Sequence, residues 1–167
     1  MPPHAPGLSD DLVERVLARL GLSARPPASA DGLATLYDAW CRNVPFDNVQ
    51  KLIHLHARAP GPLPGDEPGD FLETWLACGT GGTCWAGNGA LQAVLSALGF
   101  QASRGIGTML AVPDAAPNHG TVVVDCEDRR YIVDASILHG VPLALEADTS
   151  VAAADRPWGV AAARRDG

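Results

Sequence analysis

The N-terminal part of the chain carries apolar residues at the three- and four-residue spacing that is typical of amphipathic helices. This pattern predicts four helices, at residues 9–21, 32–42, 71–77 and 85–98. Ser9 is a suitable N-cap for the first helix, and Gly99 is a suitable stop for the last. A segment rich in glycine and proline, residues 57–70, is expected to form a surface loop.

The pattern changes after Gly99, where three segments rich in β-branched residues are separated by turn residues. They predict strands at residues 101–112, 119–126 and 129–136. If residues 126–129 form an even-length hairpin loop, Asp125 faces Arg130 and His119 faces Ser136 across the ladder. Asp134 is then the diagonal neighbour of His119 on the same face of the sheet.

These elements predict an α+β fold in one domain or two small lobes. An N-terminal helical lobe (residues 1–78) is followed by a lobe in which a helix packs on an antiparallel, barrel-like sheet (residues 79–150). The remaining tail, residues 151–167, has no strong pattern and is expected to be loosely structured.

Composition and charge exclude several classes of function. The net charge is −7 and no run of Lys or Arg is present, so nucleic acid is not an expected partner. No apolar run approaches the roughly 20 residues of a membrane-spanning helix, and the first residues do not resemble a signal peptide. The four cysteines are few and unevenly spaced, which favours free thiols in the cytoplasm over a disulfide such as Cys78–Cys84.

Cys84 stands out because it follows the glycine-rich stretch "GTGG" and opens the helix predicted at residues 85–98. Unpaired N–H groups and the positive end of the helix dipole favour a thiolate at such a position. Gly81 and Gly82 are expected to let a substrate approach the sulfur, and nearby amides to serve as oxyanion donors. The alternative is a small core residue beside a tight turn.

A thiolate nucleophile needs a base, and the base needs a group that orients it. His119 opens one predicted strand and Asp134 lies near the end of the next, on the same face. A single histidine there is usually structural and a single aspartate usually caps a turn. Together with Cys84 they fit a Cys–His–Asp arrangement.

Three segments resemble the arylamine N-acetyltransferases, whose fold is related to papain-like cysteine proteases and transglutaminases. "GGTCWAGN" is similar to the signature Arg-Gly-Gly-x-Cys-Phe/Trp-Glu-x-Asn, and "RNVPFDN", residues 42–48, is similar to Arg-x-Val-Pro-Phe-Glu-Asn. "PNHGTVVV" and "YIVDAS" carry the His and the Asp in the family's order. The resemblance implies catalysis by Cys84, His119 and Asp134, with acetyl transfer from acetyl-coenzyme A to an aromatic amine, hydrazine or hydroxylamine. It implies no bound cofactor.

The chain departs from the family pattern in ways that put the acceptor in question. Thr80 and Ala86 stand where the signature has Arg and Glu. The Arg and Glu are expected to pair as ions, so the loss of both leaves no buried charge without its partner. After Asp134 the chain reads "ASIL" where the family usually has Val-Gly-Phe-Gly. The sequence also ends where family members continue into a lid-like third domain, so either the sequence is a fragment of a longer protein or the site is more open than usual.

The sequence is also compatible with other functions. The same residues fit an amide synthase of a biosynthetic pathway, a thiol hydrolase, or a non-catalytic scaffold. His54 and His56 share a face if "KLIHLHA" is a strand, but no third ligand is evident and no metal site is expected. Cys41 and Cys126 are expected to be packing residues, and Asp47 and Asn48 to fix a turn.

Overall fold

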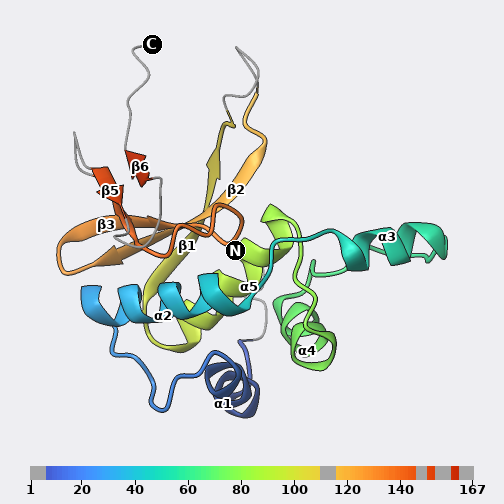
Figure 1. The fold of residues 1–167 in the computed structure, drawn as a ribbon, viewed down its shortest axis with the longest axis horizontal. Coiled ribbons are helices and arrows are strands. Elements are labelled where there is room, and N and C mark those ends of the chain that lie inside the picture. The colour runs from blue at the N-terminus through green and yellow to red at the C-terminus, as the bar shows by residue number, and fades with distance from the viewer. Residues whose placement is uncertain (1–6, 110–115, 146–149, 153–158, 162–167) are drawn as a thin grey trace, which may run out of the picture.

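The computed structural model describes residues 7–109, 116–145, 150–152 and 159–161 (Figure 1). The helices are α1 (Asp10–Arg19), α2 (Ala30–Asn43), α3 (Val49–His56), α4 (Pro68–Cys78) and α5 (Cys84–Ala97). The strands are β1 (Gln101–Gly107), β2 (His119–Cys126), β3 (Arg129–Val133), β4 (Leu143–Ala144), β5 (Ser150–Ala152) and β6 (Gly159–Ala161). The predicted α+β class is therefore confirmed.

Helix ends follow local capping chemistry. Ser9 caps α1 as predicted, its hydroxyl accepting a hydrogen bond from the Leu12 amide at 3.3 Å. α2 begins two residues before the predicted start because Ser29 caps it, accepting from the Gly32 amide at 3.2 Å. α4 also begins early, at Pro68, whose fixed φ suits the first position of a helix.

The main sheet is an antiparallel meander in the order β1-β2-β3-β4. Glu127 and Asp128 connect β2 to β3 with φ of 50° and 60°, as in a type I′ turn. This loop is two residues long rather than four, yet its even length preserves the predicted pairing of Asp125 with Arg130. β1 ends at Gly107 and β3 at Val133, both earlier than predicted; residues 110–112 lie outside the described residues.

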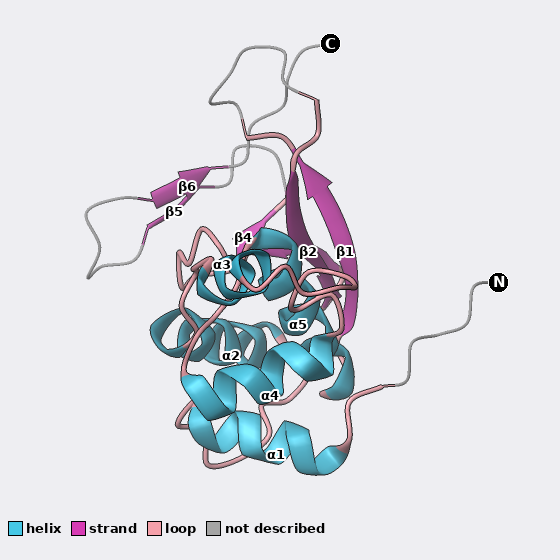
Figure 2. Ribbon diagram, turned by 90° about the vertical axis from the view of Figure 1, so that its right-hand side faces the viewer, coloured by secondary structure: helices cyan, strands magenta, loops and turns pink. Residues whose placement is uncertain are grey.

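α5 is the central element of the core. It packs against β1 and β2 on one side and against α1 and α4 on the other (Figure 2). Leu91, Val94 and Leu95 on α5 are fully buried, and one continuous cluster of apolar side chains joins the helices to the sheet. This packing fixes the first turn of α5 relative to the start of β2. The division into lobes at residue 78 stays a prediction.

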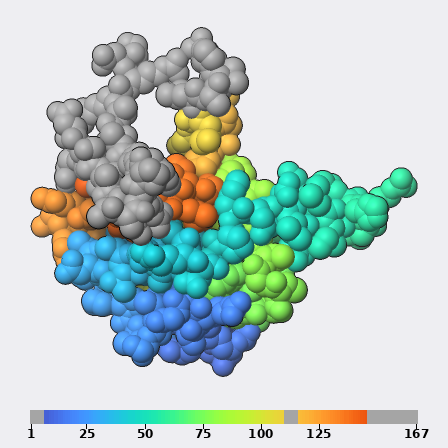
Figure 3. Space-filling view, viewed as in Figure 1, coloured from blue at the N-terminus to red at the C-terminus, as the bar shows by residue number. Residues whose placement is uncertain are grey.

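α3 projects from the body of the molecule (Figures 1 and 3). None of its residues is buried, and Leu52, Ile53 and Leu55 are all more than half exposed. The segment "KLIHLH" is helical, so the possibility that it forms a strand is wrong. His54 and His56 do not share a face, because residues two apart on a helix point in different directions. Within the described ranges no cluster of three or more metal-ligating side chains occurs.

The C-terminal segment contains more structure than its sequence pattern predicts. β5 and β6 pair with each other antiparallel, which corrects the expectation of a loose tail at these positions. The rest of the predicted tail, residues 153–158 and 162–167, lies outside the described residues. In the part of the chain that the structure describes, no helix combines the length and hydropathy needed to span a bilayer.

Candidate active site

Cys84 is the first residue of α5 and is partly buried. Thr83 is the N-cap, with extended backbone and no capping hydrogen bond from its side chain. The amides of Cys84, Trp85 and Ala86 lack hydrogen-bond acceptors among the described residues, as expected for the first turn of a helix. The first turn of α5, which begins at Cys84, thus offers a set of available N–H donors.

His119 and Asp134 form a close pair. Nε2 of His119 lies 2.6 Å from Oδ2 of Asp134, and their side chains are only 11% and 5% exposed. His119 opens β2, and Asp134 directly follows the last residue of β3. The predicted placement of these two residues on one face of the sheet is confirmed.

Asn88 ties α5 to β2 and to the segment after β3, which carry this pair. The side chain is fully buried; its Nδ2 donates to the Gly120 carbonyl at 2.7 Å, and its Oδ1 accepts from the Ala135 amide at 2.9 Å. The Trp85 ring also packs against Gly120, where an added Cβ would lie 3.2 Å from a ring carbon. Cys84 and His119 directly precede Trp85 and Gly120, so the α5–β2 contact fixes where both residues lie.

Tyr37 of α2 holds the backbone of Asp134, a role that the sequence pattern did not reveal. Its hydroxyl donates to the Asp134 carbonyl at 2.9 Å and accepts from the Asp134 amide at 3.1 Å. Burial raises the pKa of Tyr37 well above its ordinary value, so the hydroxyl stays protonated. The aspartate is therefore anchored by its main chain as well as by its side chain.

The side chain of Asp134 is held in its ionised form. Burial alone would raise the pKa of Asp134, but hydrogen bonds from Ser136, His119 and the Ile137 amide outweigh burial and lower the pKa below its ordinary value. A carboxylate in this state accepts the ring N–H of His119 and fixes which ring nitrogen carries the proton.

Arg104 of β1 supplies a positive charge near the start of α5. Its guanidinium donates to the Trp85 carbonyl at 2.9 Å and lies 5.4 Å from the centre of the Trp85 ring. Burial lowers the pKa of Arg104, while the charges of Cys84 and Asp66 act in the opposite direction. Arginine remains protonated in proteins, so a positive charge lies near Cys84.

The glycine cluster before Cys84 is shaped by packing. The Gly81 amide donates to the Asp47 carboxylate at 2.8 Å, in agreement with the predicted turn-fixing role of Asp47. A Cβ at Gly81 would lie 1.6 Å from the Pro45 carbonyl oxygen, and one at Gly82 would lie 2.8 Å from the Phe71 ring. The expectation that these glycines leave room for a substrate is therefore corrected: protein atoms fill that space.

The two departures from the nucleophile signature have local structural substitutes. The Thr80 hydroxyl accepts a hydrogen bond from the Gln50 amide group at 3.0 Å. Ala86 is buried, and its Cβ lies 2.6 Å and 3.1 Å from where Cβ atoms would stand on Gly65 and Gly82. Gly65, in the loop before α4, therefore lies close against Ala86.

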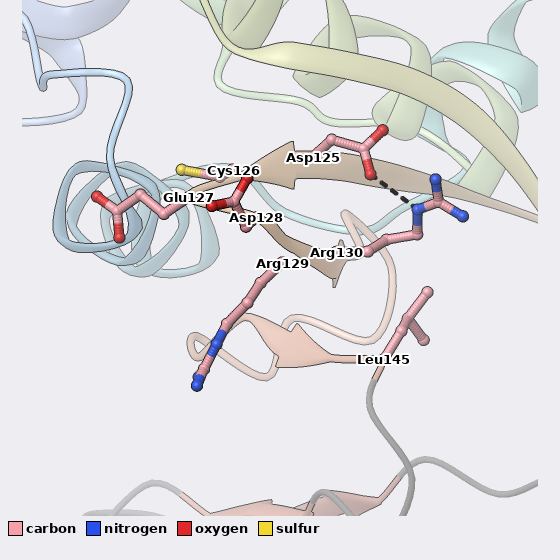
Figure 4. Close-up of a pocket in the computed structure, with 7 residues that line it drawn as sticks. All are labelled: Asp125, Cys126, Glu127, Asp128, Arg129, Arg130 and Leu145. Atoms are coloured by element: carbon pink, nitrogen blue, oxygen red, sulfur yellow. Dashed lines mark hydrogen bonds and ion pairs between the residues drawn. The ribbon is translucent and has the colours of Figure 1, made fainter.

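Two of the cavities adjoin elements that carry the site. One, of about 350 Å³, flanks the start of α5 and is lined by Lys51, Asp66, Trp85 and Arg104 among others. A larger one, of about 740 Å³, is lined by residues 125–130 and Leu145 at the turn between β2 and β3 (Figure 4). It lies at the opposite end of β2 from His119 and holds the Asp125–Arg130 ion pair, so we assign it no part in the chemistry.

All four cysteines belong to the described residues and are free thiols, so Cys78 and Cys84 are not bridged. Cys126 is buried, and burial raises the pKa of its thiol. Cys41 is partly buried against the core. The predicted packing roles of Cys41 and Cys126 are in agreement with these positions.

Known proteins with similar sequences and folds share one description. A family model described as N-acetyltransferase matches residues 29–156. A curated arylamine N-acetyltransferase of Mycolicibacterium smegmatis is 29% identical over 125 residues, covering 71% of this chain and 43% of that protein. A solved structure of the M. smegmatis enzyme superposes with a TM-score of 0.66 at 27% identity, covering 80% of this chain and 53% of that one.

More distant structures share the fold. The Salmonella typhimurium arylamine N-acetyltransferase gives a TM-score of 0.70 at 24% identity, covering 86% of this chain and 55% of that one. A Bacillus cereus homologue, described as having a unique Cys-His-Glu catalytic triad, gives 0.65 at 17% identity, covering 86% and 60%. The chain thus spans about half the length of these relatives. Since the family model covers most of its residues, including Cys84, His119 and Asp134, the chain belongs to the arylamine N-acetyltransferase family.

Proposed function

We propose that this chain is an acyltransferase that moves an acetyl group from acetyl-coenzyme A to an arylamine, hydrazine or hydroxylamine through an acetyl-cysteine at Cys84. The observation that carries the proposal is the 2.6 Å contact between His119 and Asp134, with His119 at the start of the strand whose Gly120 contacts Trp85 in the first turn of α5. The family membership supports acetyl transfer in general.

In the first half-reaction, the Cys84 thiol gives its proton to Nδ1 of His119, and the sulfur attacks the thioester carbonyl. Nε2 of His119 donates to the ionised Asp134, which leaves Nδ1 free to act as the base. The carbon–sulfur bond to coenzyme A then breaks, and the departing thiolate takes up the proton. Acetyl-cysteine and free coenzyme A are the products.

In the second half-reaction, the amine nitrogen attacks the acetyl-cysteine while His119 accepts its proton. The bond to Cys84 breaks, the amide leaves, and the proton returns to the sulfur. In both steps negative charge develops on the carbonyl oxygen. The unpaired amides in the first turn of α5 are suitable donors to this oxygen. The Gly81 amide is not, because it is already bound to Asp47.

The remaining expectations belong to the same proposal. We take the site to need no metal or bound cofactor, acetyl-coenzyme A and a small aromatic amine to be its ligands, and neither nucleic acid nor membrane to be a partner. The acidic net charge of −7 argues against nucleic acid as a partner, and the few, unevenly spaced cysteines support a cytoplasmic location.

Product analysis tests the proposal. The chain is incubated with acetyl-coenzyme A and 4-methoxyaniline, and chromatography measures free coenzyme A and the acetylated amine. We expect equal amounts of the two products with the wild type and neither with Cys84→Ala. Coenzyme A released without acetylated amine would instead indicate a hydrolase. No release from acetyl-coenzyme A would overturn the proposal, and turnover of longer tethered acyl groups alone would indicate an amide synthase.

A further inference from the structure

The two carboxylate oxygens of Asp134 have separate partners. Among the described residues, the hydrogen-bond partner of Oδ2 is Nε2 of His119, at 2.6 Å. Oδ1 accepts from the Ser136 hydroxyl at 2.6 Å, the Ser136 amide at 2.8 Å and the Ile137 amide at 3.1 Å. Hydrogen bonds from residues 136 and 137 therefore hold Oδ1 in place, and Oδ2 is oriented toward His119.

The hydroxyl of Ser136 differs from the other donors because it depends on the side chain. Any non-proline residues at positions 136 and 137 would supply the two amides, whereas only serine or threonine supplies a hydroxyl at this place. Its distance of 2.6 Å to Oδ1 is in the range of charge-assisted O–H···O⁻ hydrogen bonds. Ser136 is partly buried, so solvent screens this bond less than it would at the surface.

The same hydroxyl also lies against the histidine. Its oxygen is 3.5 Å from Nε2 of His119, too long for a strong hydrogen bond but close enough to limit how the ring turns. With its proton directed to Asp134, the hydroxyl oxygen offers a lone pair toward the ring N–H. Ser136 thus contacts both members of the pair.

We propose that Ser136 is a positioning residue whose hydroxyl holds the Asp134 carboxylate ionised and aimed at His119. This inference rests on the proposed function of the Cys84, His119 and Asp134 set. It assigns to Ser136 an effect on proton transfer, exerted through Asp134, and no contact with substrate.

The electrostatics around Asp134 agree with this role. In the part of the chain that the structure describes, the titratable groups hydrogen-bonded to it are His119 from β2 and Tyr37 from α2, while α5 presents the uncharged amide of Asn88. Burial acts to raise the pKa of Asp134, and the Ser136 hydroxyl is the largest of the influences that lower it. Removing the hydroxyl is thus expected to raise the pKa of Asp134.

The test uses the variants Ser136→Ala, Ser136→Gly and Ser136→Thr. The control is Ser96→Ala, which removes the hydroxyl of an exposed serine near the C-terminal end of α5. The rate of Cys84 acetylation is measured as a function of pH. In the Ala and Gly variants we expect a fall of roughly 10-fold, the size of one charged hydrogen bond, with the acidic limb of the profile moved to higher pH. The KM for the amine should change little. Threonine should restore most of the rate, and Ser96→Ala should match the wild type.

A second measurement works without turnover. ¹³C NMR of the Asp134 carboxyl and ¹⁵N NMR of the His119 ring, followed through a pH titration, report the carboxylate and the ring proton directly. We expect Asp134 to titrate at higher pH in Ser136→Ala and Ser136→Gly than in the wild type. Identical titration curves, or pH–rate profiles that differ only in protein stability, would overturn the proposal. If the wild type itself does not acetylate, the proposed function fails, while the titration still decides the role of Ser136.

Discussion

Cys84 differs from the other three cysteines in its local environment. It is partly buried at the first turn of α5, at the positive end of the helix dipole and near the charge of Arg104. Cys78 is exposed, but it is the last residue of α4, where the helix dipole disfavours an anion. Exposure alone would thus make Cys78 the more reactive thiol, whereas the surrounding charges and dipoles would make Cys84 the more reactive one.

We therefore expect Cys84 to react faster with iodoacetamide near neutral pH than Cys41, Cys78 or Cys126. Peptide mapping after brief labelling measures the order. Faster alkylation of the exposed Cys78 would show that accessibility, not the environment of the helix start, controls reactivity here.

Asp134→Asn replaces the oxygen that contacts His119 with either an NH₂ group or an uncharged oxygen. We expect acetylation of Cys84 to slow roughly 10³–10⁴-fold, because the wrong ring nitrogen then carries the proton. The pKa of Asp134 is lowered in the folded state, so its ionisation stabilises the fold above its unfolded pKa and this contribution is lost as the pH falls through its folded pKa. The stability difference between wild type and variant should accordingly shrink in acid. A variant with near-normal acetylation would show that Asp134 is only structural.

At the scale of elements, the site depends on how α5 is joined to β2 and to the segment after β3. Asn88 makes both connections from a fully buried position. The Asn88→Ala variant leaves the Gly120 carbonyl and the Ala135 amide without partners, and we expect it to lose roughly 2–4 kcal/mol of unfolding free energy. Urea denaturation measures this loss. Gln92→Ala on the same helix, whose hydrogen bonds are more exposed, is the control, and an equal loss there would contradict the assignment.

Substitution of two leucines on different helices compares the stability cost at a core position with the cost at a surface position. Leu91 of α5 is fully buried, whereas Leu52 of the projecting α3 is 55% exposed. Leu91→Ala should cost about 2–5 kcal/mol, and Leu52→Ala should stay within about 0.5 kcal/mol. Thermal and urea unfolding measure both. A large cost at Leu52 would mean that α3 is covered in solution.

Elements with strong local patterns could be predicted from sequence, and those set by distant contacts could not. Ser9 and the apolar stripe of α1 were sufficient for that helix, and hairpin parity was sufficient to place His119 beside Asp134 and Ser136. The contact of Tyr37 with Asp134 joins residues 97 positions apart, and no local pattern encodes it. α3 was not predicted, because "KLIHLHA" suits a strand as well as a helix and none of the residues of α3 is buried.

At the scale of the whole molecule, one core fixes the relative positions of the three candidate catalytic residues. α1 and α4 pack behind α5, and the sheet packs in front of it, so the start of α5 and the start of β2 are set by the same apolar cluster. Residues on separate elements can then act as a unit, because rigid elements hold side chains more precisely than loops do.

The most direct test of this account is the covalent state of Cys84 after exposure to acetyl-coenzyme A in the absence of amine. Intact-mass and peptide mass spectrometry of the quenched protein measure it. The account predicts one acetyl group per chain, located on Cys84, with its formation strongly slowed in His119→Ala and its loss accelerated by added arylamine. An unmodified Cys84, or an acetyl group on Cys78 at the same rate in wild type and His119→Ala, would contradict it.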